Sequence, residues 1–182
     1  MKKLKGRRIV LAVTGGIAAY KACALASKLV HSGAAVRAVM THTATRLVGP
    51  LTLQALTNHP VVAGDEGGVA AHGMEHIELA QWGEILVVVP CTAHMLGMLA
   101  HGLGGDVVST LSLAFRGPQV LCPAMNPHMW QKPAVRRNVK TLRGDGFIVV
   151  EPETGPTACG EEGEGRLPAE ERLIEIIAQH LP

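Results

Sequence analysis

Aromatic residues are scarce in this sequence, which holds two Phe, one Tyr and two Trp and is 3% aromatic over 182 residues. Charge of either sign is also nearly balanced, with 17 Lys and Arg against 15 Asp and Glu and a formal net charge of +2. Nucleic-acid-binding proteins usually carry a basic stripe with stacking aromatics, and membrane-surface proteins often carry a basic amphipathic helix. The sequence shows neither pattern, so we expect no nucleic-acid partner and no membrane partner.

Cysteine is rare as well, with four residues spread along the chain at Cys23, Cys91, Cys122 and Cys159. No two of them form a C-x-x-C pair, and their spacing is irregular, which argues against a disulfide framework or a zinc ribbon. We therefore expect free thiols and a reducing, cytoplasmic setting. Cys23, Cys91 and Cys122 fall in helix-like or strand-like segments and are predicted to be inert small core residues.

Long hydrophobic runs are missing too, although the N-terminus begins with the basic stretch KKLKGRR followed by IVLAVTGGIAAYKA. Positive residues before apolar ones are typical of a secretory signal, but Thr14, Gly15, Gly16 and then Lys21 interrupt the run. No segment approaches the length of a membrane span. A buried strand over Ile9–Val13, a glycine turn and a helix over Ile17–Val30 is the better interpretation.

A glycine turn between a strand and a helix directs backbone N–H groups at an anion, commonly a phosphate. Gly15 and Gly16 are adjacent, and Ala19 stands where a dinucleotide fingerprint would have its third glycine. The pattern therefore suits a mononucleotide better than a dinucleotide. A tight turn that holds no ligand is the alternative.

The content of 47% hydrophobic residues can fill one sizeable core, and no linker divides the chain, so we expect a single domain over residues 1–182. Short apolar runs alternate with helix-like segments, which is typical of an α/β fold: a doubly wound parallel sheet, Rossmann-like or flavodoxin-like, with helices on both faces. Further strands are predicted at Val36–Met40, Ile85–Val89, Gln119–Cys122 and Phe147–Val150. Further helices are predicted at Thr43–Thr57, Thr92–Gly102, Val107–Phe115, Pro133–Arg143 and Ala169–His180.

Ligands of such sheets bind beyond the carboxyl ends of the strands. The residues that follow the predicted strands should therefore converge on one edge of the sheet. They are Thr14-Gly15-Gly16, Thr41-His42-Thr43, Pro90-Cys91-Thr92 and Pro123-Ala124-Met125-Asn126.

Two loops have unusual compositions, PAMNPHMW at Pro123–Trp130 and TACGEEGEGR at Thr157–Arg166. The first matches the P-x-M-N-x-x-M-W signature of the flavin-dependent cysteine decarboxylases. The second resembles the substrate-covering flap of their phosphopantothenoylcysteine decarboxylase branch. TGGIAAYKA, GMEHIELAQW and PCTAHMLGMLAHGLGGD align in order, so the resemblance covers nearly the whole chain. Departures are Cys91, His94 and Met98, where the family commonly has alanine, asparagine and a basic residue.

The resemblance implies an FMN enzyme that decarboxylates phosphopantothenoylcysteine to phosphopantetheine in coenzyme A biosynthesis. Loss of CO₂ from an acylated cysteine needs an electron sink. In the family, FMN first oxidises the cysteine side chain to a thioaldehyde, CO₂ leaves to give an ene-thiolate, and the hydride then returns. The resemblance also implies trimers or larger oligomers with the site at a subunit contact. In bacteria such a decarboxylase is often fused to a ligase domain that makes its substrate, and since this sequence has no room for one, we expect it to act alone or with a separate ligase.

Roles for individual residues follow from the same match. His76 is assigned as the base and Cys159 as the proton donor, while Asn126 should bind the substrate carboxylate or amide. Met125, Ala158 and Gly160 complete the expected substrate site, and Met125, Met129 and Trp130 are predicted to be packing residues. For FMN we expect Gly15, Gly16, Ile17, Thr41, Thr92, Asp106 and Ser109, although a threonine at a strand end is equally often a helix cap.

A metal site is a weaker interpretation of His72, Glu75 and His76. The order is inverted relative to H-E-x-x-H, a glycine lies between the histidines, and no third ligand is evident, so we expect no metal. Other functions remain open: a peptidyl-cysteine decarboxylase of the same family, a non-catalytic FMN-binding regulatory relative, a flavin prenyltransferase or a flavodoxin-like electron carrier. Cys159 favours the coenzyme A pathway, and the near-neutral charge disfavours the electron carrier.

Overall fold

The structure is a computed structural model that describes residues 4–64, 74–156, 158 and 160–182. Its centre is a six-stranded sheet in the order β3-β2-β1-β4-β5-β6, and every neighbouring pair is parallel. The strands are β1 (Arg8–Val13), β2 (Ala35–Met40), β3 (Val62–Ala63), β4 (Ile85–Cys91), β5 (Gln119–Pro123) and β6 (Ile148–Val149). The predicted doubly wound α/β sheet is confirmed.

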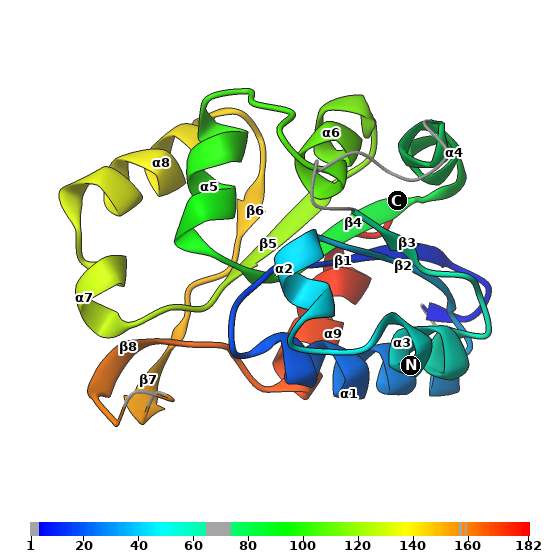
Figure 1. Ribbon diagram of the computed structural model, residues 1–182, viewed down its shortest axis with the longest axis horizontal. Coiled ribbons are helices and arrows are strands. Elements are labelled where there is room, and N and C mark those ends of the chain that lie inside the picture. Colours follow the sequence, from blue (N-terminus) through cyan, green and yellow to red (C-terminus); the bar gives the residue numbers. More distant parts are fainter. Residues whose placement is uncertain (1–3, 65–73, 157, 159) are drawn as a thin grey trace.

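Helices cover both faces of the sheet (Figure 1). One face packs against α1 (Ala19–His31), α3 (Pro50–Thr57) and α9 (Glu170–His180), and the other against α4 (Glu75–Trp82), α5 (Ala93–Ala100), α6 (Val107–Ala114) and α8 (Pro133–Gly144). Strand β1 is apolar from Ile9 onward because it is buried on both faces of the sheet. Ile9 and Leu11 lie in the first core and Val10 in the second, and all three are fully buried.

The segment Thr43–Thr57, predicted as one helix, forms two helices, and that prediction is wrong. α2 (His42–Thr45) ends before Gly49, whose extended backbone precedes α3. Pro50 has no N–H to donate within a helix, so it is accommodated at the first position of a new one. The short edge strand β3 was also not predicted.

A small antiparallel hairpin projects beyond the sheet, formed by β7 (Glu153–Pro156) and β8 (Glu162–Arg166). Sequence patterning predicted only a loop here, because glycine and glutamate lack the alternating apolar pattern of a strand. The hairpin lies next to α7 (Pro127–Trp130), the short helix of the PAMNPHMW segment (Figure 1).

Candidate functional site

A cavity of about 1700 Å³ opens at the carboxyl edge of the sheet. It is lined by the loops after β1, β2, β4 and β5, by the turn before α6 and by the β7–β8 hairpin. The sheet is extended from β1 in one direction through β2 and in the other through β4, so the loops after β1 and β4 diverge there. Small-molecule sites usually measure roughly 300–1,000 Å³, so this cavity has room for two organic ligands at once.

Thr14 connects the two central loops. Its side chain is 1% exposed, and its hydroxyl donates to the carbonyl oxygen of Pro90 at 2.6 Å and accepts from the N–H of Thr92 at 3.2 Å. Gly15 and Gly16 follow it and line the cavity, as predicted. A β-carbon at Gly15 would collide with Thr43, so the chain comes as close as it does because no side chain is present.

Three of the predicted cofactor residues line the cavity and also cap helices. Thr41 accepts from the N–H of Ala44 at 3.3 Å, and Thr92 accepts from the N–H of Met95 at 3.2 Å. Asp106 Oδ1 accepts from two N–H groups at the start of α6, at 2.9 and 2.8 Å. The helix-cap interpretation of the strand-end threonines is therefore confirmed, and their place at the cavity is compatible with the predicted cofactor role.

Ser109 is the predicted cofactor residue that faces elsewhere. It is fully buried in α6 and is not among the residues that line the cavity. Its hydroxyl donates to the backbone oxygen of Asp106 at 3.0 Å and accepts from the Asp106 N–H at 3.0 Å. These bonds complete a capping box, so the hydroxyl serves the helix terminus.

The loop after β5 carries Met125 and Asn126, and both line the cavity as predicted. The hairpin is held against this loop by the N–H of Met125, which donates to the carbonyl oxygen of Gly165 at 2.9 Å. Gly165 has φ of +147°, and a β-carbon there would collide with the carbonyl oxygen of Met125. Ile17 and Ala158 also line the cavity.

Met129 and Trp130 of the PAMNPHMW segment differ in how exposed they are. Trp130 is 1% exposed, in the core that includes α5 and α8, which agrees with its prediction as packing. The Arg136 guanidinium lies 4.8 Å from the centre of its ring. Met129, by contrast, is 46% exposed and borders the cavity, so it can also contact a ligand.

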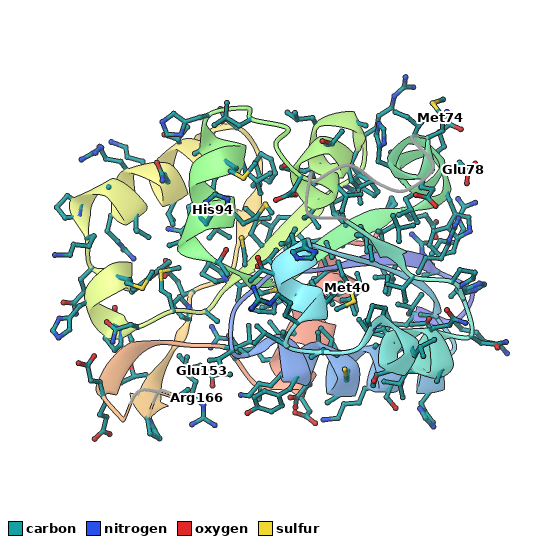
Figure 2. The ribbon with its side chains drawn as sticks, viewed as in Figure 1. Met40, Met74, Glu78, His94, Glu153 and Arg166 are labelled. Atoms are coloured by element: carbon teal, nitrogen blue, oxygen red, sulfur yellow. The ribbon has the colours of Figure 1, made fainter. Side chains whose placement is uncertain are left out.

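His76 is half-buried in α4 and does not line the cavity of its own chain. Figure 2 labels its helix neighbours Met74 and Glu78 at the opposite side of the view from His94, which does line the cavity. Gly160 likewise is not a lining residue. Cys159 and His72 lie outside the described residues.

Two cations at the cavity were not predicted, Lys21 and Arg166. Lys21 follows Ile17 by four residues, and that helical spacing could have indicated a shared face. Arg166 ends β8, and only the docking of the hairpin brings it to the cavity. Among the described lining residues, Asp106 is the one acidic side chain. The two cations therefore outweigh it, and the charges of the cavity favour an anionic ligand.

The cysteines that the structure describes are not poised for chemistry. Burial raises the pKa of Cys91 well above its ordinary value and that of Cys122 to about 12, and it also raises the pKa of the half-buried Cys23. Since the thiolate is the reactive form, Cys91 and Cys122 remain neutral core residues. Their prediction as inert core is confirmed.

Comparison with known proteins identifies the family. The sequence profile described as Flavoprotein matches residues 1–182. The chain belongs to the flavoprotein family. Among curated relatives, the coenzyme A biosynthesis bifunctional protein CoaBC of Bacillus subtilis (strain 168) is 44% identical over 177 residues, which are 97% of this chain and 44% of CoaBC. This flavoprotein thus spans less than half the length of that relative.

Two solved structures are also similar to this flavoprotein. A PPC decarboxylase mutant complexed with pantothenoylaminoethenethiol has a TM-score of 0.83 and 26% identity, with 96% of this chain and 98% of that chain covered. The FMN-dependent cysteine decarboxylase SpaF has a TM-score of 0.79 and 34% identity, with 98% and 97% covered. The resemblance of the sequence to flavin-dependent cysteine decarboxylases is therefore confirmed.

Within the described ranges, no group of three or more His, Cys, Asp and Glu side chains could hold a metal ion. No helix in this part of the chain is long and apolar enough to cross a membrane.

Proposed function

We propose that this flavoprotein catalyses the FMN-dependent decarboxylation of phosphopantothenoylcysteine to phosphopantetheine. The observation that carries the proposal is the fixed carboxamide of Asn126 at the cavity. Its Oδ1 accepts from the N–H of His128 at 2.8 Å, so Nδ2 is its hydrogen-bond donor, and this donor already binds a carboxylate, that of Glu161. A donor in that place, in a cavity with Lys21 and Arg166, suits a substrate that carries a carboxylate and a phosphate.

The residues of the cavity fit FMN. Gly15 and Gly16 line the cavity at the turn between β1 and α1, and Lys21 adds a positive charge to the same cavity. Apolar side chains such as Met95, Met98 and Leu103 provide a surface for a planar ring system. When bound, FMN supplies the reversible two-electron chemistry that makes decarboxylation possible.

The chain's own residues would bind the substrate and move protons. Asn126 orients the carboxylate that is lost, and the apolar wall and the hairpin exclude water. Cys159, in the segment between β7 and β8, is proposed to donate a proton to the ene-thiolate as the product is completed. His76 is proposed to act as the base.

Because His76 does not line the cavity of its own chain, we propose that it reaches the site of a neighbouring copy in a trimer or larger oligomer. Exposed apolar side chains at the cavity and on α3 support such a contact between copies of the chain. Ile17 and Tyr20 border the cavity and are 64% and 63% exposed, and Leu51 on α3 is 76% exposed. Such side chains become buried when copies of the chain associate.

The test is incubation of the purified holoprotein with phosphopantothenoylcysteine, with mass spectrometry of the product and absorbance of the released cofactor. We expect loss of CO₂ and release of FMN on denaturation. His76→Asn should retain FMN and lose at least about 10²-fold in turnover, the usual contribution of a positioned acid–base group. A colourless protein that cannot take up FMN would end the proposal.

A peptidyl-cysteine decarboxylase is the second candidate. SpaF, an FMN-dependent cysteine decarboxylase, is 34% identical to this chain, against 26% for the PPC decarboxylase structure, so a cysteine substrate other than phosphopantothenoylcysteine is the alternative to test. The same incubation with a peptide that ends in cysteine separates the two. The coenzyme A assignment also predicts that Cys159→Ser releases CO₂ but accumulates an oxidised product two hydrogens lighter. A cytoplasmic location, consistent with the free thiols Cys23, Cys91 and Cys122, and a ligase activity that makes the substrate complete the proposal.

A further inference from the structure

Glu161, which directly precedes β8 in the hairpin, contacts the side chain proposed to bind the substrate carboxylate. Its Oε2 accepts from Asn126 Nδ2 at 2.5 Å, and its Oε1 lies 3.9 Å from His128 Nε2. The two residues are 35 positions apart in sequence, so the contact depends on the hairpin docking against the loop after β5. Nothing in the role of Asn126 as a substrate ligand requires this partner.

The orientation of the Asn126 carboxamide shows which chemistry its outer atom can bind. A backbone N–H can only donate, so the atom 2.8 Å from the His128 nitrogen must be the carbonyl oxygen. The amide nitrogen therefore faces Glu161, and it binds acceptors. A charged carboxylate is the strongest such acceptor among protein groups.

We propose that Glu161 is a positioning residue whose carboxylate occupies the place of the substrate carboxylate on Asn126, and that the substrate displaces it on binding. This inference rests on the proposed function, because it takes Asn126 to be the carboxylate ligand. The carboxamide nitrogen has two N–H donors, but two carboxylates bound to the same nitrogen would lie in contact and repel each other, so the substrate carboxylate disfavours Glu161 there. Displacement of Glu161 is thus coupled to substrate entry.

The exchange distinguishes substrate from product. The substrate has a carboxylate that can replace Glu161 on Asn126, whereas the product has lost it as CO₂. Once CO₂ leaves, Glu161 can return to Asn126 without competition. Glu161 therefore weakens substrate binding through direct competition and leaves product binding unaffected.

The matched variants are Glu161→Ala and, on the same hairpin, Glu162→Ala, since Glu162 is also exposed. Dissociation constants of phosphopantothenoylcysteine and phosphopantetheine are measured by calorimetry on the holoprotein under anaerobic conditions. The FMN is kept chemically reduced throughout, so that it cannot oxidise the substrate and the substrate carboxylate is retained. We expect Glu161→Ala to bind the carboxylate substrate roughly fivefold to tenfold more tightly, the effect of removing a partly exposed charge-assisted competitor. Product affinity should not change, and Glu162→Ala should match the parent.

Two results would overturn the inference. If Glu161→Ala weakens substrate and product alike, Glu161 only holds the hairpin in place. If substrate affinity is unchanged, no competition exists. Failure of the proposed function looks different, because the parent protein itself would then bind neither ligand.

A second measurement tests the contact without the substrate. In ligand-free holoprotein, the side-chain amide resonances of Asn126 should shift in Glu161→Ala and not in Glu162→Ala. N-acetylcysteine, a small carboxylate probe, should shift them at a lower concentration in Glu161→Ala than in the parent. Resonances that stay in place in Glu161→Ala would show that the contact is absent, and the inference would be wrong whatever the substrate is.

Discussion

At the scale of single residues, the reactivity of a cysteine thiol depends on how deeply it is buried. Cys91 ends β4 and Cys122 lies in β5, and both are fully buried next to loops that form the site. Their position near the cavity could suggest a nucleophile, but burial keeps both thiols protonated. Proximity to a site therefore does not by itself give a cysteine a role in the chemistry.

This predicts the pattern of thiol alkylation. At pH 8, iodoacetamide should leave Cys91 and Cys122 of the folded protein unmodified, because their pKa values lie far above the solution pH. Peptide mapping by mass spectrometry locates the modified residues, and alkylation in denaturant, where all four cysteines should react, is the control. Rapid labelling of Cys122 under native conditions would contradict its burial.

At the scale of elements, the turn before α6 has two functions. Asp106 borders the cavity and caps the helix through two N–H groups. Ser109 completes the cap from the buried side. The cavity wall and the helix terminus therefore share one carboxylate.

Substitution of Asp106 separates these functions. Asp106→Ala should lower the free energy of unfolding of the apoprotein by about 1 kcal/mol, the usual cost of losing a helix N-cap. Asp106→Asn should retain most of that stability, since its amide oxygen can accept the same bonds. Urea denaturation measures the first effect, and FMN titration of both variants measures the second. Equal stability of Asp106→Ala and the parent would show that the cap contributes little.

The hairpin depends on a glycine for its close approach to the loop after β5. Gly165→Ala adds a β-carbon that would collide with the carbonyl oxygen of Met125, in a backbone conformation that L-residues rarely adopt. We expect the hairpin to move away from Asn126 and turnover to fall at least about tenfold, because misplaced site residues cost large factors in rate. FMN affinity should change much less.

The matched control is Gly144→Ala in α8, where an added β-carbon meets nothing within 4 Å. Limited proteolysis of the hairpin, compared between the two variants, reports its position independently of activity. If Gly165→Ala keeps full turnover, docking of the hairpin is not required for the reaction.

At the scale of the whole molecule, His76 does not line the cavity of its own chain, which predicts that copies of the chain share their sites. His76→Asn and Asn126→Asp should each be nearly inactive alone. When the two variants are unfolded together and refolded as mixed oligomers, about one quarter of the sites in an equal mixture combine an intact His76 with an intact Asn126, and activity should return to that extent. Steady-state assays before and after mixing, with sedimentation to establish the oligomer, measure the effect. No recovery in confirmed mixed oligomers would place both residues in one subunit's site.

Much of the fold could be predicted from the sequence because its signals are local. The continuous apolar runs predicted the strands that became β1, β2, β4 and β5, since a strand buried on both faces needs apolar residues at every position. The helices α8 and α9 were found from their length and pattern. The hairpin and β3 could not be found in this way, because they are short and their stability comes from neighbouring elements rather than from their own residues.

The sequence by itself determined which residue types were available for the site: the Gly15-Gly16 turn, the strand-end threonines and the PAMNPHMW segment. Only the tertiary structure decided which of them meet. Thr14 contacts Pro90 across 76 positions, Ser109 turns into the core while Asp106 faces the cavity, and Glu161 reaches Asn126 from the hairpin. Periodicity and propensity act over a few neighbouring residues, whereas these contacts depend on how β1 pairs with β4 and how the hairpin docks on α7, which are properties of the packed chain.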